Sequence, residues 1–351
     1  MTGKTLAKIN TDGLKPKLIV KKLLSALPER SRAVLESRFG LGGSTERITL
    51  EAIGKKYGIT RERVRQIENH ALAALKKAPA FAEAERTFAE LEKIIDSLGG
   101  IVCEDDLLNF ITQDRAMQNC IYFLLVVGDP FKYRKEDDEV RRCWYVDQDL
   151  ANKVEQSLKR LYGTIADEDL IPEGEMIDRF LKELQTINDK HRNDEVLKRW
   201  LSISKSVGRN PLGEWGQAKS RSVRTKGVRD FAYLAVKKHG SPLHFREVAA
   251  MIGKMFDRQA HVATTHNELI KDPRFVLVGR GMYALKEWGY SAGVVRDVIR
   301  DILRKEGPLT KEQVIEKVLK ERHVKHGTIA VNLQNHKYFK RGKDGRYSTV
   351  K

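Results

Sequence analysis

The feature that most constrains this chain is a pair of short helices joined by a glycine turn, encoded within residues 48–77. The segment ITLEAIGKKYGIT, residues 48–60, predicts a helix capped by Thr49 and a turn at Gly58. A second helix, capped by Thr60, follows in RERVRQIENHALAALKK. Its apolar positions fall within one narrow arc and predict a buried stripe: Val64, Ile67, Ala71 and Leu75. This spacing predicts a helix-turn-helix.

The opposite face of the second helix presents side chains that read bases or bind phosphates: Arg61, Glu62, Arg63, Arg65, Gln66 and Asn69. Arg can bond guanine, Gln or Asn can bond adenine, and Glu can accept from cytosine. Lys55 and Lys56 on the first helix are placed to contact phosphates, while Ile53 packs inward. A solvated, salt-bridged helix face is the alternative, since charged outer faces are common. The preceding helix and turn favour DNA.

Residues 27–77, LPERSRAVLESRFGLGGSTERITLEAIGKKYGITRERVRQIENHALAALKK, resemble region 4 of sigma-70-type bacterial RNA polymerase sigma factors. The resemblance implies a domain that binds the minus-35 promoter element and docks on the flap of the polymerase beta subunit. It implies promoter contacts by Arg61, Glu62, Arg63, Arg65 and Gln66. The similarity covers about fifty of 351 residues, and nothing else resembles the region that melts promoters. A sigma-derived accessory factor is therefore expected, rather than a complete sigma factor.

Composition narrows the class of protein. A length of 351 residues with 41% hydrophobic content predicts two or more domains. No apolar run is long enough to cross a bilayer, and the first residues lack a secretory core, so we expect a cytoplasmic, nucleoid-associated protein without a membrane partner. Cys103, Cys120 and Cys143 form no Cys-x-x-Cys pair, which predicts buried thiols rather than disulfides or a zinc site.

Charge changes sign along the chain. Residues 1–80 carry a net charge of +10, residues 81–150 carry −8, residues 151–220 are neutral, and residues 221–351 carry +15. Both ends are suited to polyanions, because excess positive charge attracts phosphates and makes binding salt-sensitive. The acidic segment is suited to a protein partner, or to keeping that part of the chain off DNA.

A weak repeat occupies the second half of the chain. HGSPLHFREVAAMIGKMF, residues 239–256, and EGPLTKEQVIEKVLKERH, residues 306–323, share a Gly-Pro-Leu element followed by a helix. Each leads to a hairpin, in RFVLVGRGMYALKEW and in KYFKRGKDGRYSTV. A further helix fits between, at residues 261–272 and 326–337, in the position of a recognition helix. This layout predicts winged helices.

Looser versions of the layout begin at Gly100 and Gly163, giving four winged-helix modules in all. The expected fold class is mainly α: an N-terminal helix-turn-helix domain followed by an array of small winged-helix (α+β) modules. The expected divisions are an N-terminal extension, the helix-turn-helix domain and the four modules: residues 1–26, 27–80, 86–148, 150–218, 226–289 and 293–350.

Residues 226–289 resemble the HARE helix-turn-helix, a winged domain found in the delta subunit of RNA polymerase and attached to various nucleases and chromatin proteins. GSPLHF, FREVAAMIGKMF and THNELIKDPRFVLVGRGMYALKEW carry this similarity. Candidate base contacts are Thr264, Thr265 and Asn267, on a helix whose Val262, Leu269 and Ile270 are expected to be buried. Capping and solvation are the alternative roles for the polar three. Arg280 and Lys343, at the two wing turns, are expected to contact phosphate.

An enzymatic role is the main rival. His261, His266 and Asn267 suggest a His-Asn-His nuclease, but they lie in an expected recognition helix without that motif's hairpin and metal-ligand arrangement. We therefore expect a non-enzymatic transcription factor without a cofactor, bound metal or small-molecule substrate, acting on double-stranded promoter DNA with the RNA polymerase core. The alternatives are a polymerase-associated interaction protein of the delta-subunit kind and a general DNA-architectural protein.

Overall fold

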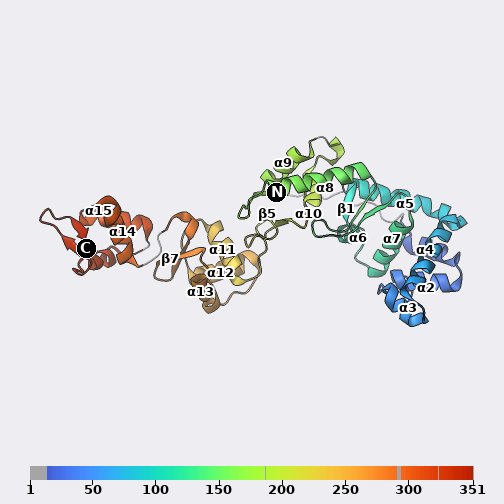
Figure 1. Ribbon diagram of the computed structural model, residues 1–351, viewed down its shortest axis with the longest axis horizontal. Coiled ribbons are helices and arrows are strands. Elements are labelled where there is room, and N and C mark those ends of the chain that lie inside the picture. The colour runs from blue at the N-terminus through green and yellow to red at the C-terminus, as the bar shows by residue number, and fades with distance from the viewer. Residues whose placement is uncertain (1–13, 186, 291–293, 323, 351) are drawn as a thin grey trace. The chain divides into compact units, whose positions relative to one another are not determined.

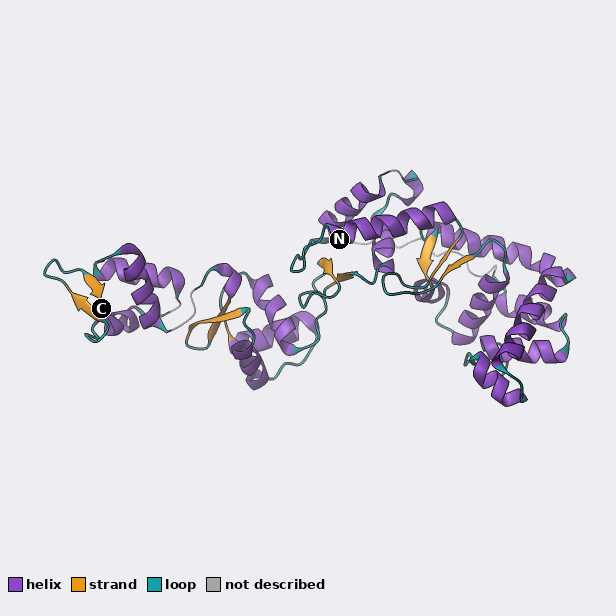
Figure 2. Ribbon diagram, in the orientation of Figure 1, coloured by secondary structure: helices purple, strands orange, loops and turns teal. Residues whose placement is uncertain are grey.

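The computed structural model describes residues 14–185, 187–290, 294–322 and 324–350 (Figure 1). These residues form sixteen α-helices and several short strands (Figure 2), which confirms the expectation of a mainly α fold. The chain divides into two compact units, unit 1 at Met1–Gly208 and unit 2 at Arg209–Lys351. Among the described residues, no helix combines the length and hydropathy that a bilayer crossing requires.

The N-terminal domain, residues 14–78, consists of four helices: α1 (Pro16–Ser25), α2 (Glu29–Phe39), α3 (Leu50–Tyr57) and α4 (Arg61–Lys77). The helix α2 ends at Gly40, whose φ of +64° belongs to the left-handed region that glycine adopts without strain. The helix-turn-helix itself is α3 followed by α4. Within the expected N-terminal extension, residues 1–13 lie outside the described residues, whereas α1 packs against α5 and α7 of the next segment.

The acidic module, residues 79–146, alternates helices and strands: α5 (Pro79–Ser97), β1 (Ile101–Cys103), α6 (Glu104–Ile111), α7 (Arg115–Val127), β2 (Lys132–Arg134) and β3 (Cys143–Tyr145). Its sheet has the order β1-β3-β2, and both pairings are antiparallel. Cys103 lies opposite Cys143 across the sheet, and both are buried and free, as is Cys120. The expectation of buried thiols is confirmed.

One hydrophobic core continues from the N-terminal domain into the acidic module. For example, the Phe39 ring of α2 meets the Phe123 ring of α7 edge-on, with centroids 5.1 Å apart. Ion pairs join the basic and acidic surfaces at the margins of this contact: Lys17–Asp114, Lys22–Glu83 and Lys76–Asp129. One protein partner of the acidic segment is therefore the chain's own N-terminal domain.

The rest of unit 1 is largely helical. Its elements are α8 (Gln148–Gly163), α9 (Glu173–Leu184), a 3-10 turn (Asp189–His191) and α10 (Asp194–Ile203), and β4 (Val207–Arg209) runs across the boundary with unit 2. Trp200 of α10 is fully buried, and its Nε1 donates to the Gly99 carbonyl at 3.1 Å, which ties this segment to the acidic module. The boundary between the units lies inside the expected 150–218 module, and β5 (Trp215–Gln217) belongs to unit 2.

Unit 2 contains a module at residues 228–288 with the same element order as the acidic module: α11 (Val228–His239), β6 (Leu243–His244), α12 (Phe245–Phe256), α13 (Val262–Lys271), β7 (Phe275–Gly279), β8 (Met282–Leu285) and a 3-10 turn (Lys286–Trp288). Its antiparallel sheet has the order β6-β8-β7, and Leu243 pairs with Tyr283.

A buried ion cluster holds α13 to α11 in this module. The Arg274 guanidinium donates to Asp272 at 2.6 Å and to Asp230 at 3.0 Å, and its Cζ lies 4.7 Å from the centre of the Tyr233 ring. Burial alone would raise the pKa of Asp272, but hydrogen bonds from Arg274 outweigh it and lower that pKa below its ordinary value. Asp272 and Arg274, within the segment that carries the HARE-type similarity, therefore have a structural role.

The C-terminal module, residues 294–350, is formed by α14 (Val295–Glu306), α15 (Lys311–Glu321), α16 (His326–Leu333), β9 (Phe339–Arg341) and β10 (Tyr347–Thr349). The strands β9 and β10 are paired antiparallel, and the three helices enclose a separate core that includes Ile329 and Phe339. Both hairpins expected near the ends of the two repeats are thus present.

Candidate nucleic-acid interface

The helix-turn-helix forms from local signals that agree with one another. Thr49 Oγ1 accepts from the Ala52 N–H at 3.2 Å and caps α3, and Thr60 Oγ1 accepts from the Arg63 N–H at 3.2 Å and caps α4. Gly58 adopts a φ of +64° in the turn between them. A Cβ on Gly54 would lie 2.6 Å from the Ile59 carbonyl oxygen. A glycine inside α3 therefore allows the close approach to the start of α4, a requirement that the sequence analysis missed.

The helix α4 has the two faces that its sequence predicts. Val64, Ala71 and Leu75 are fully buried, and Ile67 is half-buried. The outer face is exposed at all six candidate positions: Arg61, Glu62, Arg63, Arg65, Gln66 and Asn69. None of these side chains is needed to fill a core, so the face is available to a partner.

Short-range bonds arrange the outer face. Arg65 donates from Nε and Nη2 to the two oxygens of Glu62, at 2.8 and 2.7 Å, and Arg63 Nη1 donates to Gln66 Oε1 at 3.1 Å. Hydrogen bonding to Arg65 lowers the pKa of Glu62, so this carboxylate stays ionised at neutral pH. Because guanidinium has five N–H donors, Arg65 keeps donors for a base edge or phosphate while Glu62 restrains it.

Lys55 and Lys56 lie at the end of α3, and both are exposed. Lys55 Nζ lies 3.0 Å from Glu51 Oε1, and Lys56 Nζ lies 5.5 Å from the centre of the Tyr57 ring. Exposed contacts of this kind are weak, so both ammonium groups can turn to a phosphate.

The structure separates the candidate contacts of α13. Thr264 and Asn267 are exposed, but Thr265 is fully buried and its hydroxyl donates to the His261 carbonyl at 3.0 Å. Thr265 is therefore withdrawn from the candidate set. Thr265 and Leu269, one turn apart, form the inward row of this short helix.

The expectation of burial for Val262 and Ile270 was also wrong: they are 42% and 62% exposed. By the helical period, both side chains lie on the same flank of the inward row, near the two ends of the ten-residue helix. An apolar side chain alone did not indicate the buried face.

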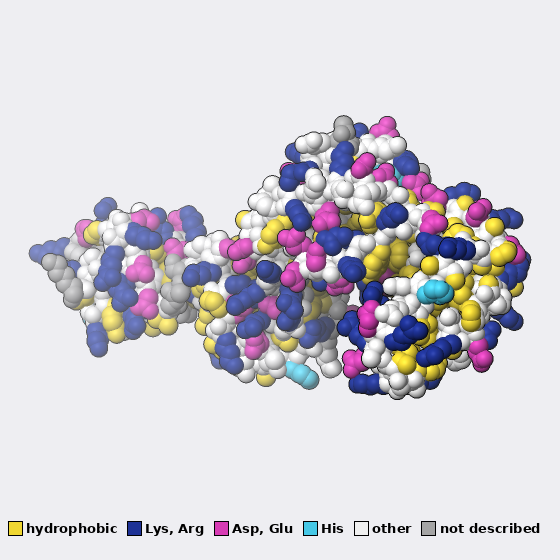
Figure 3. All heavy atoms as spheres, turned by 45° about the vertical axis from the view of Figure 1, so that its right-hand side comes forward, with side chains coloured by type: hydrophobic (Ala, Val, Ile, Leu, Met, Phe, Trp, Pro, Cys, Tyr) yellow, Lys and Arg dark blue, Asp and Glu magenta, His cyan; other side chains and the backbone are white. Residues whose placement is uncertain are grey.

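The two hairpin turns carry different surfaces. Arg280 is exposed beside Gly281, whose φ of +73° forms the turn, and Leu277 on the adjoining strand is 50% exposed. Lys343 is exposed in the second turn. The second hairpin is the more basic, with four exposed or half-exposed cations: Lys340, Arg341, Lys343 and Arg346. Lys and Arg side chains are widespread on the face of the molecule drawn in Figure 3.

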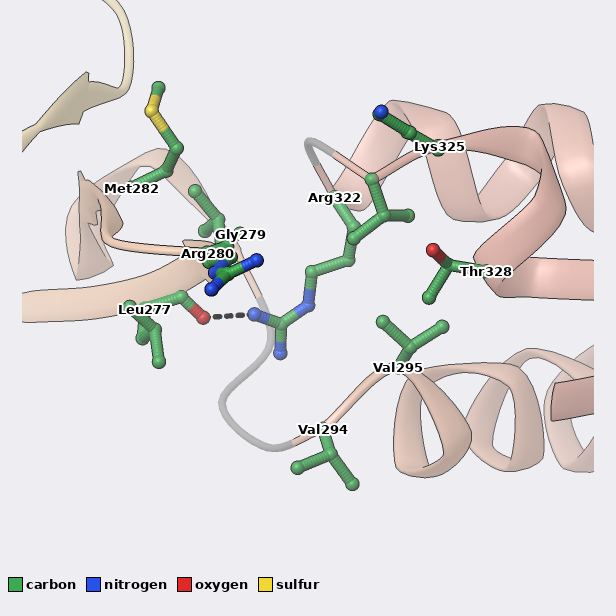
Figure 4. Close-up of a pocket in the computed structure, with 11 residues that line it drawn as sticks. Leu277, Gly279, Arg280, Met282, Val294, Val295, Arg322, Lys325 and Thr328 are labelled. Carbon is green, nitrogen blue, oxygen red and sulfur yellow. Dashed lines mark hydrogen bonds between the residues drawn. The ribbon is translucent and has the colours of Figure 1, made fainter. Parts of the chain in front are cut away.

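A pocket of about 660 Å³ lies in unit 2 (Figure 4). The Arg322 side chain extends toward the Leu277 carbonyl and donates to it, with Val294, Val295 and Thr328 nearby. Arg280 also lines this pocket. The described residues that line it supply cations, apolar groups and the Thr328 hydroxyl, and none of these described residues carries a carboxylate or a thiol. Throughout the described part of the chain, no three or more His, Cys, Asp and Glu side chains come together as a metal site would require.

Comparison with known proteins places the helix-turn-helix in a family. Residues 23–77 match Sigma-70, region 4. The RNA polymerase principal sigma factor HrdD of Streptomyces viridifaciens is 47% identical over 55 residues, which is 16% of each chain. The RNA polymerase sigma factor RpoD of Helicobacter pylori strain 26695 is 40% identical over 72 residues, 20% of this chain and 11% of its own. The matches thus span a small part of these relatives, and the chain contains a sigma-70 region 4 domain of helix-turn-helix type.

Proposed function

We propose that this protein is a non-enzymatic, sequence-specific DNA-binding transcription factor that acts in transcription initiation, or in its regulation, with bacterial RNA polymerase. Its working location would be the cytoplasm, at the nucleoid. One observation carries the proposal: the exposed face of α4 presents Arg61, Glu62, Arg65 and Gln66 on a region 4 domain whose fold does not require them. Major-groove readout needs amide, guanidinium and carboxylate groups on one accessible helix face.

In this proposal α4 enters the major groove and Lys55 and Lys56 hold the phosphates beside it. Arg65 would read a guanine, with Glu62 fixing its guanidinium plane until DNA arrives. Gln66 and Asn69 would read neighbouring positions, while Arg61 and Arg63 would bind backbone at the flanks. The similarity to sigma factors supports a site like the minus-35 promoter element.

The polymerase part of the proposal rests on the relatives, which are named as RNA polymerase sigma factors. By analogy the partner is the polymerase core, at the beta flap. Copurification with polymerase after nuclease treatment tests this separately from DNA binding. A purely protein-mediated role predicts copurification with no preferred DNA site.

We further interpret the 228–288 module as a HARE-type winged helix, and the acidic and C-terminal modules as members of a winged-helix array. The helix-strand-helix-helix-strand-strand order of two of them supports this interpretation. In unit 2, Thr264 and Asn267 would face DNA from α13, and Arg280 and Lys343 would contact phosphate from the wings.

The decisive experiment is selection of duplexes from a random pool by the full chain, followed by Arg65→Ala. We expect the variant to bind the selected duplex roughly tenfold or more weakly and to lose preference at one or two base pairs. The matched control is Arg32→Ala, which removes an Arg from α2 instead of the candidate base-reading face. If Arg65→Ala weakened binding equally on all sequences, α4 would be a phosphate-binding helix and not a reader.

The basic second hairpin favours one other function, sequence-independent DNA binding of the architectural kind. Neutralising Lys340, Arg341, Lys343 and Arg346 together should make the salt dependence of binding shallower, by about 0.9 in log–log slope for each phosphate that the hairpin no longer neutralises. For the wild-type chain, an architectural role predicts a steep salt dependence of binding and no duplex enriched in the selection.

A further inference from the structure

The predicted apolar stripe of α4 belongs to two different cores. Val64 packs with Val34 of α2 and Ile53 of α3, in the small core of the helix-turn-helix. Ala71 and Leu75, about two and three turns further on, pack in the large core that the N-terminal domain shares with the acidic module. The acidic module therefore supports the C-terminal half of the helix whose N-terminal half carries the candidate DNA contacts.

A second support reaches the loop that precedes the helix-turn-helix, residues 40–48. It comes from Asn119 of α7, a polar side chain that is fully buried. Its Nδ2 donates to the carbonyls of Gly40 at 3.0 Å and Thr45 at 2.8 Å, and its Oδ1 accepts from Arg47 Nε at 2.8 Å. Among the described residues, every hydrogen bond given for the Asn119 side-chain amide is to this loop. Each of these bonds joins residues more than seventy positions apart in the sequence.

Arg47 extends the connection into the acidic module. Its guanidinium carbon lies 3.9 Å from the centre of the Tyr122 ring, and Nη1 lies 3.9 Å from Oε1 of the buried Glu104. Arg47 is only two residues before Thr49, the residue that caps α3. On the other side of the loop, Arg38 Nη1 donates to the Ile48 carbonyl at 3.3 Å. The start of α3 is thereby held from both sides.

The surroundings of Gly40 leave no room for a side chain at this position. A Cβ at this position would lie 2.6 Å from Asn119 Nδ2 and 2.8 Å from the Thr45 carbonyl oxygen. Gly40 therefore serves both the left-handed end of α2 and the approach of the Asn119 amide. The hydrogen bonds of Asn119, the backbone conformation of Gly40 and the contacts of Arg47 therefore all favour the same position of the loop.

We propose that the DNA-reading unit of this protein is residues 14–146, and that Asn119 is a positioning residue for the recognition helix. This inference rests on the proposed function, because it assumes that α4 reads DNA. The helix α7 is the third helix of the acidic module, as α13 is the third helix of the 228–288 module. In this proposal α7 binds the N-terminal domain and not nucleic acid. Site-specific affinity then depends on a module that touches no base, because bond geometry at a reading helix tolerates little displacement.

The test compares two neighbouring amides of α7 in the full chain. Asn119→Ala leaves two loop carbonyls and the Arg47 donor without their partner. Gln118→Ala is the matched control: Gln118 is also buried, but its amide donates to Asn109 and Thr112 inside the acidic module. Affinity is measured for a duplex selected by the wild-type chain and for an unselected duplex of equal length, and amide hydrogen exchange is followed in residues 40–48 without DNA.

We expect Asn119→Ala to weaken binding of the selected duplex about tenfold, to leave the unselected duplex within about twofold, and to speed exchange across residues 40–48. Gln118→Ala should leave all three readouts near wild type. Equal loss of selected-duplex affinity in both variants, or wild-type exchange and affinity in Asn119→Ala, would overturn the proposal.

A milder variant covers the case in which Asn119→Ala does not fold. Arg47→Lys keeps the positive charge but removes the Nε donor and the flat guanidinium over Tyr122. We expect the same pattern, with a smaller loss on the selected duplex, and unchanged affinity and exchange would refute the positioning role. If the wild-type chain selects no duplex, the proposed function fails. The exchange data then decide by themselves whether Asn119 positions the loop.

Discussion

The acidic module and the 228–288 module have the same order of helices and strands and the same sheet order, but their third helices differ. In α7, eight of thirteen residues are buried, including Phe123 and Leu124. In α13, two of ten are buried, Thr265 and Leu269. The comparison teaches that the position of a helix in such a module does not determine its role. A helix with apolar residues around most of its circumference packs against protein, whereas one with a narrow inward row leaves an exposed face for a partner.

The largest expected difference between the two modules is the stability cost of placing a carboxylate on the third helix of each. Leu124→Asp places a carboxylate in the shared core and should cost at least about 4 kcal/mol, enough to unfold this part of unit 1. Ile270→Asp on α13, at a position 62% exposed, should change stability by less than about 0.5 kcal/mol. Urea unfolding read by segment-resolved proteolysis distinguishes the two, and similar costs would mean that α13 is covered in solution.

The next largest effect is expected at the ion cluster that anchors α13 to α11. In the 228–288 module Arg274→Met leaves the buried Asp230 and Asp272 without their cation, and we expect a loss of about 3 kcal/mol confined to unit 2. The thermal transition of the 228–288 module reports the loss. An unchanged transition would show that the two carboxylates are satisfied without Arg274.

The same cluster predicts a pH dependence that sharpens the contrast. Because the folded pKa of Asp272 is lowered, its contribution to stability is present above the unfolded value, about 4, and is lost as pH falls through the folded value. Thermal unfolding followed from pH 6 to pH 2.5 should show this loss in wild type. Asp272→Asn should flatten that part of the profile, and an identical slope in the variant would assign the dependence to other carboxylates.

The smallest effect is expected at the rim of the contact between the N-terminal domain and the acidic module. Lys22→Gln and Lys76→Gln each remove one exposed ion pair, with Glu83 and with Asp129, and should cost less than about 1 kcal/mol at low salt. The difference should vanish near 1 M salt, because exposed charges are screened. A large, salt-independent cost would indicate that the ion pairs, and not the shared core, hold the two segments together.

Much of the candidate interface could be predicted from the sequence because its causes are local. Thr49, Gly58 and Thr60 set the ends of α3 and α4 through bonds that span four residues or fewer, and the helical period orients α4. The base contacts themselves remain predictions. The burial of Thr265 and the exposure of Ile270 were missed because the orientation of a short helix is set by its neighbours and not by its own composition.

The acidic segment shows more clearly what the sequence alone cannot predict. Its net charge of −8 indicated a protein partner or exclusion of this segment from DNA, but composition could neither decide between the two nor name a partner. Hydrogen bonds between Asn119 and residues more than seventy positions away leave no periodic signal in the chain. Within the sequence, Asn119 is one polar residue in an apolar helix, and only the folded chain shows which groups it satisfies.

By itself, the sequence determined the helix-turn-helix, the outward set of α4 and the hairpins, because caps, glycine turns and amphipathic periods act between residues that are close along the chain. Only the tertiary structure decided that α4 spans two cores and that α7 faces the N-terminal domain instead of solvent. The physical reason is that burial and hydrogen-bond satisfaction are properties of the whole packed unit: a buried amide such as that of Asn119 is stable only where distant backbone groups converge on it.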